Sequence, residues 1–120
     1  MKYICLLYNE DAKLDAMSEA EWDALTGETA ACNEELRRRG HLIAAQVLER
    51  ARAATTVRVR NGRLFATEGP AAGAPEQLRG FVLIDARDLN EAIQVASKMP
   101  GARVGSIEVR PIPDVDRKDR

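Results

Sequence analysis

Two titratable side chains stand where a fold could present them to a substrate. His41 is the only histidine in the sequence, and it opens an apolar run. Its imidazole titrates near neutrality and suits general acid–base catalysis, whereas the structural alternative is a strand-start histidine satisfied by a backbone carbonyl. Glu68 closes an extended run at the corner Glu68-Gly69-Pro70, where a rigid scaffold often presents a functional group. Acting as a pair, His41 would move a proton and Glu68 would orient or charge-balance it.

Four further polar or aromatic side chains are candidate substrate contacts: Gln46, Glu76, Arg110 and Tyr8. Each has a structural alternative. Gln46 suits a polar anchor in an apolar cleft or a hydrogen bond in a dimer interface. Glu76 suits a ligand contact or the first-turn acid of a short helix. Arg110 binds an anion or pairs with a carboxylate, and Tyr8 lines a cleft or only packs there.

Several classes of site have no motif in this sequence. There is no glycine-rich phosphate loop and no nucleophile elbow. One histidine and two separated cysteines, Cys5 and Cys32, leave too few ligands for a zinc cluster. We therefore expect no metal and no cofactor. Both cysteines sit in apolar patterns, so we expect two buried thiols rather than a disulfide.

The bulk composition limits the choice of partner and compartment. The 120 residues suit one domain, and a formal net charge of −1 gives no electrostatic reason to expect nucleic acid or an anionic membrane. No apolar run approaches the roughly 20 residues that span a bilayer, and residues 1–8 lack the features of a signal peptide. The sequence thus predicts a cytoplasmic protein.

The first half of the chain predicts a strand, a helix and a second strand. A short apolar run over residues 2–8 favours a strand. Ser18 and Glu21 form a capping box, and an apolar stripe then predicts a helix over Ser18 to Arg39, with Gly40 following its end. Residues 41–49 read as a strand that is apolar on both faces, so it needs a cover on each side.

The second half begins with a hairpin. Asn61-Gly62 between extended runs at 55–60 and 63–67 predicts a tight turn with both central residues at positive φ. A strand at 78–85, a helix from Asp88 to Met99 and a strand at 104–110 follow. We expect one domain over residues 1–113 and a frayed tail at 114–120.

This order of elements predicts the fold class. Without the hairpin, it is the β-α-β-β-α-β unit of a ferredoxin-like α+β sandwich, an antiparallel sheet with two helices on one face. The other face of the sheet needs a cover as well. Two sheets packed face to face across a two-fold axis supply it, so the pattern predicts a homodimer.

Five stretches in series carry a family resemblance: KYICLLY, Gly40-His41, ATTVRVRNGRL, TEGPAAGAPEQLRGFVLIDARDLNEAIQVASKMP and GSIEVRPI. Together they resemble the YCII-related, DGPF-domain family over nearly the whole chain. Where the family signature reads Asp-Gly-Pro-Phe, this chain reads Glu68-Gly69-Pro70-Ala71. The longer acid moves the carboxylate outward by roughly 1 Å, a misplacement that can cost ~10²-fold in rate.

The resemblance implies a dimeric α+β barrel and a cleft that, in related members, holds a His/Asp pair suspected of acid–base work. It also implies gene neighbours that encode extracytoplasmic-function sigma factors. Two functions follow as hypotheses. One is a cofactor-free acid–base enzyme that acts on a small organic molecule, with His41 and Glu68 as its pair. The other is a non-catalytic small-ligand-binding or regulatory protein that associates with a sigma factor.

The sequence also predicts where a ligand binds. We expect a pocket between a helix, the sheet and the loop from Glu68 to Pro75. Its floor should come from apolar strand residues, and its polar groups from His41, Glu68 and Arg110. Small residues in the loop, Ala71 to Ala74, predict an open mouth.

Overall fold

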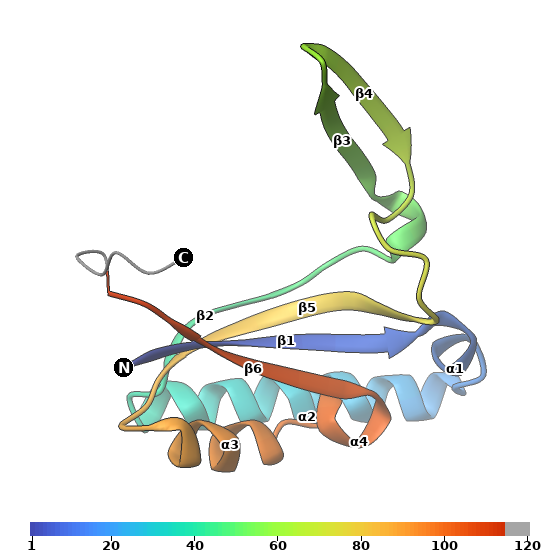
Figure 1. Ribbon diagram of the computed structural model, residues 1–120. Coiled ribbons are helices and arrows are strands. Elements are labelled where there is room, and N and C mark those ends of the chain that lie inside the picture. The colour runs from blue at the N-terminus through green and yellow to red at the C-terminus, as the bar shows by residue number, and fades with distance from the viewer. Residues whose placement is uncertain (115–120) are drawn as a thin grey trace.

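The computed structural model describes residues 1–114, and in this part of the chain a four-stranded sheet carries helices on one face (Figure 1). The elements follow in the order β1 (Lys2–Glu10), α1 (Asp11–Asp15), α2 (Glu19–Arg38), β2 (Leu42–Val47), the 3-10 turn η1 (Ala51–Ala53), β3 (Thr55–Arg60), β4 (Arg63–Glu68), β5 (Glu76–Asp85), α3 (Leu89–Ser97), α4 (Gly101–Val104) and β6 (Ser106–Ile112). Apart from Asp114, the predicted tail at 114–120 lies outside the described residues.

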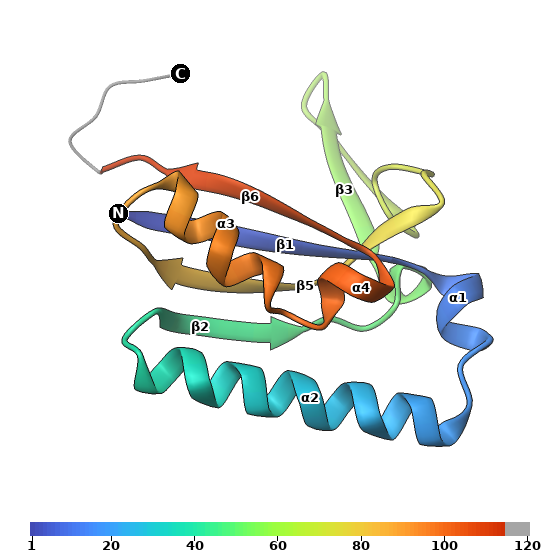
Figure 2. The same ribbon diagram turned by 90° about the horizontal axis from the view of Figure 1, so that it is seen from below.

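The sheet confirms the predicted ferredoxin-like class. Its strand order is β2-β5-β1-β6, and all three neighbouring pairs are antiparallel. With the hairpin set aside, this is the β-α-β-β-α-β arrangement. Figures 1 and 2 show α2 and α3 lying along the same face of the sheet.

The long helix begins and ends where the local sequence indicates. The Ser18 hydroxyl accepts a hydrogen bond from the Glu21 amide at 3.1 Å, and the Glu21 carboxylate accepts one from the Ser18 amide at 3.2 Å, which completes the capping box. Gly40 follows with a φ of 77°, a left-handed conformation that glycine adopts without a Cβ penalty. The residue α2 buries most fully is Leu36, near this end.

The second helix is shorter than predicted and is followed by a separate turn. Helix α3 ends at Ser97, and the four-residue α4 comes between it and the last strand. Strand β6 therefore begins at Ser106, two residues later than expected. The short helix α1 after β1 was also not predicted. Both short helices are single turns, too brief to leave a helical periodicity in the sequence.

Alternate residues of the central strands form the core. The helix-covered face of β1 and β5 contributes four buried side chains: Tyr3, Cys5, Val82 and Ile84. Their neighbours point to the opposite face, which no helix covers, as period-2 alternation requires. We call this second surface the open face. Its central side chains are half-buried: Ile4, Leu6, Phe81 and Leu83.

Strands β3 and β4 form a separate two-stranded sheet. Asn61 (φ 52°) and Gly62 (φ 74°) make the predicted turn between them. Figure 1 shows this hairpin rising away from the main sheet on the side opposite the helices. Within residues 1–114, no helix is both long and apolar enough to span a membrane.

Candidate functional site

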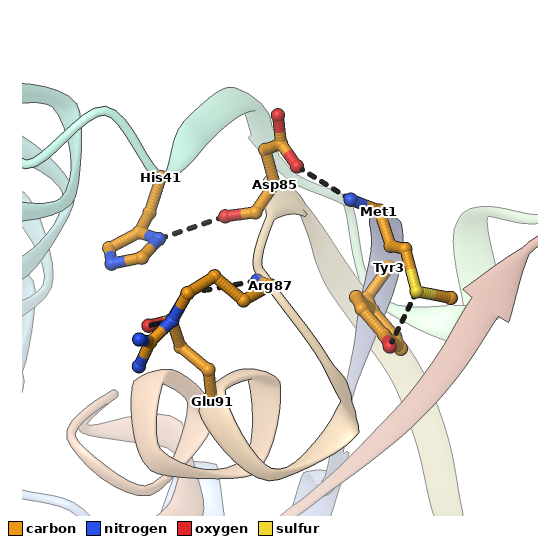
Figure 3. Close-up of polar contacts among 6 residues, drawn as sticks. All are labelled: Met1, Tyr3, His41, Asp85, Arg87 and Glu91. Atoms are coloured by element: carbon orange, nitrogen blue, oxygen red, sulfur yellow. Dashed lines mark hydrogen bonds and ion pairs between the residues drawn. The ribbon is translucent and has the colours of Figure 1, made fainter.

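His41 lies between α2 and β2, at the end of the sheet that also holds the start of β1 and the end of β5. The Asp85 amide donates to the His41 carbonyl at 2.8 Å, and His41 Nδ1 lies 2.8 Å from the Asp85 carbonyl oxygen (Figure 3). A carbonyl oxygen only accepts, so Nδ1 carries the proton. The basic atom of the neutral imidazole is therefore Nε2.

The imidazole borders a hollow of about 570 Å³ between the second half of α2 and α3. Its lining is largely charged or polar and includes Glu35, Arg39, Arg87, Asp88 and Glu91. Figure 3 shows the pair of Arg87 and Glu91 beside the His41 ring. The hollow therefore contains an imidazole, the side chain best suited to general acid–base catalysis.

Glu91 is held as a carboxylate by Arg87. The Arg87 amide donates to one carboxylate oxygen at 2.9 Å, and Arg87 Nε donates to the other at 2.8 Å. The backbone hydrogen bond from Arg87 is the main cause that lowers the pKa of Glu91, and the charge of His41 acts in the same direction. Glu91 therefore stays ionised at neutral pH and can stabilise a protonated imidazole nearby.

The opposite wall of the hollow carries a second acid of the same kind. Glu35 accepts hydrogen bonds from Arg39 Nε at 2.8 Å and from Arg38. The hydrogen bond from Arg39, with the charge of Arg38, lowers the pKa of Glu35. The hollow thus has ionised carboxylates on both helices, each partly neutralised by arginine.

The predicted partnership of His41 with Glu68 does not form within one chain. Glu68 ends β4 and pairs with Thr55 in the hairpin, which follows the far end of β2. In Figure 1 the hairpin joins the sheet at the end opposite the α2–β2 connection. Glu68 lies away from the main sheet because β3 and β4 pair only with each other. The segment over residues 48–75 contacts the main sheet only near its two ends.

Register places the four other predicted contacts on the open face. Tyr8 pairs with Ser106 and Leu78, Glu76 with Glu10, and Gln46 with Phe81, while Arg110 pairs with Ile4. They lie toward different edges: Gln46 on β2 and Arg110 on β6. The sheet therefore brings all four to one surface, but it does not gather them beside His41.

Two of these side chains already have protein partners. The Ser106 hydroxyl donates to both carboxylate oxygens of Glu76 at 3.0 Å. Glu76 begins a strand, so the alternative of a helix start is wrong. Arg110 forms an ion pair with Glu108, whose hydrogen bond raises the pKa of Arg110. Pairing with a carboxylate was one of the two alternatives that the sequence suggested for Arg110.

A larger hollow of about 670 Å³ lies between α2 and the covered face of the sheet. Its floor comes from apolar strand residues, among them Leu7 and Val82. None of His41, Glu68 and Arg110 lines this hollow of the single chain, and the loop over residues 69–75 does not border it. Gln46 also borders it at the edge strand, although its register opposite Phe81 assigns its side chain to the open face.

Four polar residues that sequence reasoning missed face the two hollows. Glu91 and Arg87 are spaced four apart at a helix start, which reads as a cap rather than as part of a site. Asn9 and Arg79 border the larger hollow, and nothing in their local sequence marks them. Among residues 1–114, no group of three or more histidine, cysteine or acidic side chains is arranged to hold a metal ion.

Comparison with known proteins agrees with the fold. The family model described as the YCII-related domain matches residues 1–116. An uncharacterized protein of Rhizobium meliloti (strain 1021) is 34% identical over 114 residues, a match that covers 93% of this chain and 92% of that protein.

Proposed function

The chain belongs to the YCII-related domain family, and from that premise we propose that it is a cofactor-free general acid–base enzyme acting on a small organic molecule beside His41. One observation carries the proposal. The Asp85 carbonyl holds the proton on His41 Nδ1, so that Nε2 is the basic atom of a ring that borders a hollow. A general base needs such a fixed tautomer and access to a substrate proton.

The neighbours of His41 supply the other parts of the chemistry. Once Nε2 has taken a proton, the imidazolium lies near the negative charge of Glu91. Arg87 Nε donates a hydrogen bond to Glu91, and the two terminal nitrogens of Arg87 can donate to an anionic group of the substrate. The substrate class that suits this site is a small carbon acid bearing a carbonyl or carboxylate group, from which Nε2 removes a proton.

Proton exchange tests this proposal without a known substrate. A panel of small oxo acids and other carbonyl compounds is incubated with the protein in deuterated water, and exchange at the carbon next to the carbonyl is followed by NMR. The expected result is exchange of at least one compound, slowed by ~10²-fold or more in His41→Gln, which is the usual contribution of a general base. Glu68→Gln is the matched control and should keep the wild-type rate, because Glu68 lies in the hairpin. Equal rates in the wild type and His41→Gln would overturn the assignment.

We also propose that two copies pack their open faces together. The half-buried row of Ile4, Leu6, Phe81 and Leu83 supplies an apolar centre. The hairpin rises on the same side of the sheet and exposes four more apolar side chains: Val57, Val59, Leu64 and Phe65. A patch of this kind on a single chain marks an interaction surface, and a second copy offers a matching one.

Two further expectations from the sequence carry over as proposals. Association with a sigma factor would be seen as copurification from cells that express both proteins. A cytoplasmic location would be seen by cell fractionation. The binding of a small ligand without catalysis has separate support in the larger hollow between α2 and the sheet.

A further inference from the structure

The larger hollow is bordered mainly by apolar and small side chains. Helix α2 contributes Trp22, Leu25 and Ala30, and the sheet contributes Leu7 and Val82. Met99 and Val104 close the hollow near α4. Figure 2 shows α2 running alongside β2. Helix α4 lies near the C-terminal end of β2, on the side of that strand away from α2. A volume of about 670 Å³ lies within the range of roughly 300–1,000 Å³ that small-ligand pockets occupy.

Asn9 places an unpartnered amide at this hollow. The residue is 9% exposed, and its side chain forms no hydrogen bond with any other residue of the described chain. Buried side-chain nitrogen and oxygen atoms within residues 1–114 all have partners, so the Asn9 amide is reachable rather than sealed in. An accessible amide on the wall of this hollow can form a hydrogen bond with a polar group that enters it.

Arg79 brings a positive charge to the same region. Leu7 pairs with Gly80 and Tyr8 with Leu78, so Arg79 is the extra residue of a β-bulge. Bulges re-aim a side chain and are common beside binding sites. Arg79 borders the hollow, and its guanidinium donates a hydrogen bond to the Leu48 carbonyl. Within residues 1–114, no carboxylate lies within ion-pairing distance of it.

The two polar groups belong to neighbouring strands at one end of the sheet. Asn9 pairs with Gln77, two residues before Arg79 on β5. Gly80, next to the bulge, lets β2 approach closely, since a Cβ there would lie 2.7 Å from the Gln46 carbonyl oxygen. The hollow therefore has a cation and an amide at one end, and its remaining walls are mainly apolar, with four further polar residues among them: Thr26, Thr29, Asn33 and Gln46.

We propose that this hollow binds a small monocarboxylic acid with an apolar body. The carboxylate accepts hydrogen bonds from Arg79 and from the Asn9 amide nitrogen, and the body lies between α2 and the floor formed by Leu7 and Val82. Burial of a cation against apolar walls favours an anionic head over a neutral or cationic one. This site is separate from the one beside His41, and the proposal does not rest on catalysis there.

Binding of octanoate tests the proposed head group, with 1-octanol as its neutral counterpart. We expect saturable binding of octanoate by titration calorimetry, weakened about tenfold or more in Arg79→Gln, because a charge-assisted hydrogen bond is lost. Octanol binding should change little. Arg58→Gln, an exposed arginine of the hairpin, is the matched control. The same weakening in both variants, or no saturable binding of octanoate to the wild type, would overturn the proposal.

A second pair of variants tests the location without touching Arg79. Ala30 borders the hollow, whereas the next residue, Ala31, does not, and both are exposed on α2. Ala30→Trp should abolish binding of octanoate and octanol alike, and Ala31→Trp should leave both unchanged, with the helical content of each variant checked by circular dichroism. Equal binding by the two variants would place the ligand elsewhere. His41→Gln should bind octanoate like the wild type, which separates this test from that of the acid–base proposal.

Discussion

The two faces of the central sheet are built from the same strands, yet they have different environments. On the covered face Cys5 and Ile84 are completely buried under the helices. On the open face their neighbours Leu6 and Leu83 stay half-exposed. The alternation of the strands makes both faces apolar, but the two long helices cover only one of them. The open face is therefore an incomplete core.

The edges of the open face support this comparison. Polar pairs lie along β6, where Ser106 contacts Glu76 and Arg110 contacts Glu108. The apolar side chains lie on the central strands β1 and β5. An apolar centre with a polar edge is the usual anatomy of a protein interface.

Truncating one side chain on each face should give the largest difference in the free energy of unfolding. Ile84→Ala removes a fully buried side chain and should lower the free energy of unfolding by about 2–5 kcal/mol at any protein concentration. Leu83→Ala should cost less at high dilution and more as the concentration rises, because in the proposed dimer its cover comes from a second copy. Urea unfolding over a series of protein concentrations measures both. An equal and concentration-independent loss would remove the distinction between the faces.

A charge on the open face should separate the copies. Leu6→Glu places a carboxylate at the centre of the proposed interface, and burial of an unpaired charge costs several kcal/mol. We expect a monomer by size-exclusion chromatography with light scattering, whereas the proposal predicts a dimer for the wild type. Ala24→Glu, on the exposed surface of α2, is the control and should stay dimeric. A monomeric wild type at micromolar concentration would refute the dimer.

Alkaline pH tests whether water is excluded from the covered face of the sheet. Burial raises the pKa of the Cys5 thiol from 9.0 to about 11. Because the folded chain holds this proton more tightly, the contribution of Cys5 is fully present below pH 9 and is lost as the pH rises through 11. The loss should be on the order of 1–3 kcal/mol.

The difference between the wild type and Cys5→Ala isolates this titration from that of other groups. Unfolding free energies measured at neutral pH and near pH 11 should converge for the two proteins at the higher pH. If the difference does not change with pH, the thiol is hydrated and the covered face is not dry there.

The smallest effect is expected in the hairpin, which belongs to neither face. Gly62 has a φ of 74°, where a Cβ costs about 1–2 kcal/mol. Gly62→Ala should speed amide exchange in residues 55–68 and leave β1 and β5 unchanged, as followed by NMR. Faster exchange throughout the sheet would mean that the hairpin supports the core directly.

Local sequence predicted much of this structure correctly. The capping box at Ser18, the glycine after α2 and the turn at Asn61-Gly62 each depend on a few neighbouring residues, and all three are present. The order of elements was enough to predict the ferredoxin-like sheet. Both cysteines are free, and Cys5 is buried as expected, while Cys32 is only half-buried.

Tertiary structure decided the sites, because they depend on segments far apart in the chain. His41 obtained its partner from Asp85, 44 residues away, and this backbone carbonyl contact was the structural alternative that the sequence had left open. The same fold moved Glu68 out on the hairpin and brought Glu91 and Arg87 to the imidazole instead.

The bulge at Arg79 likewise depends on tertiary structure and cannot be predicted from the local sequence. It exists only in the register between β1 and β5, where Leu7 and Tyr8 face Gly80 and Leu78, and no local pattern announces it. Residue types and their periodicity determined which segments became strands and helices. The pairing of strands distant in sequence decided which side chains meet, because register is a property of two segments at once.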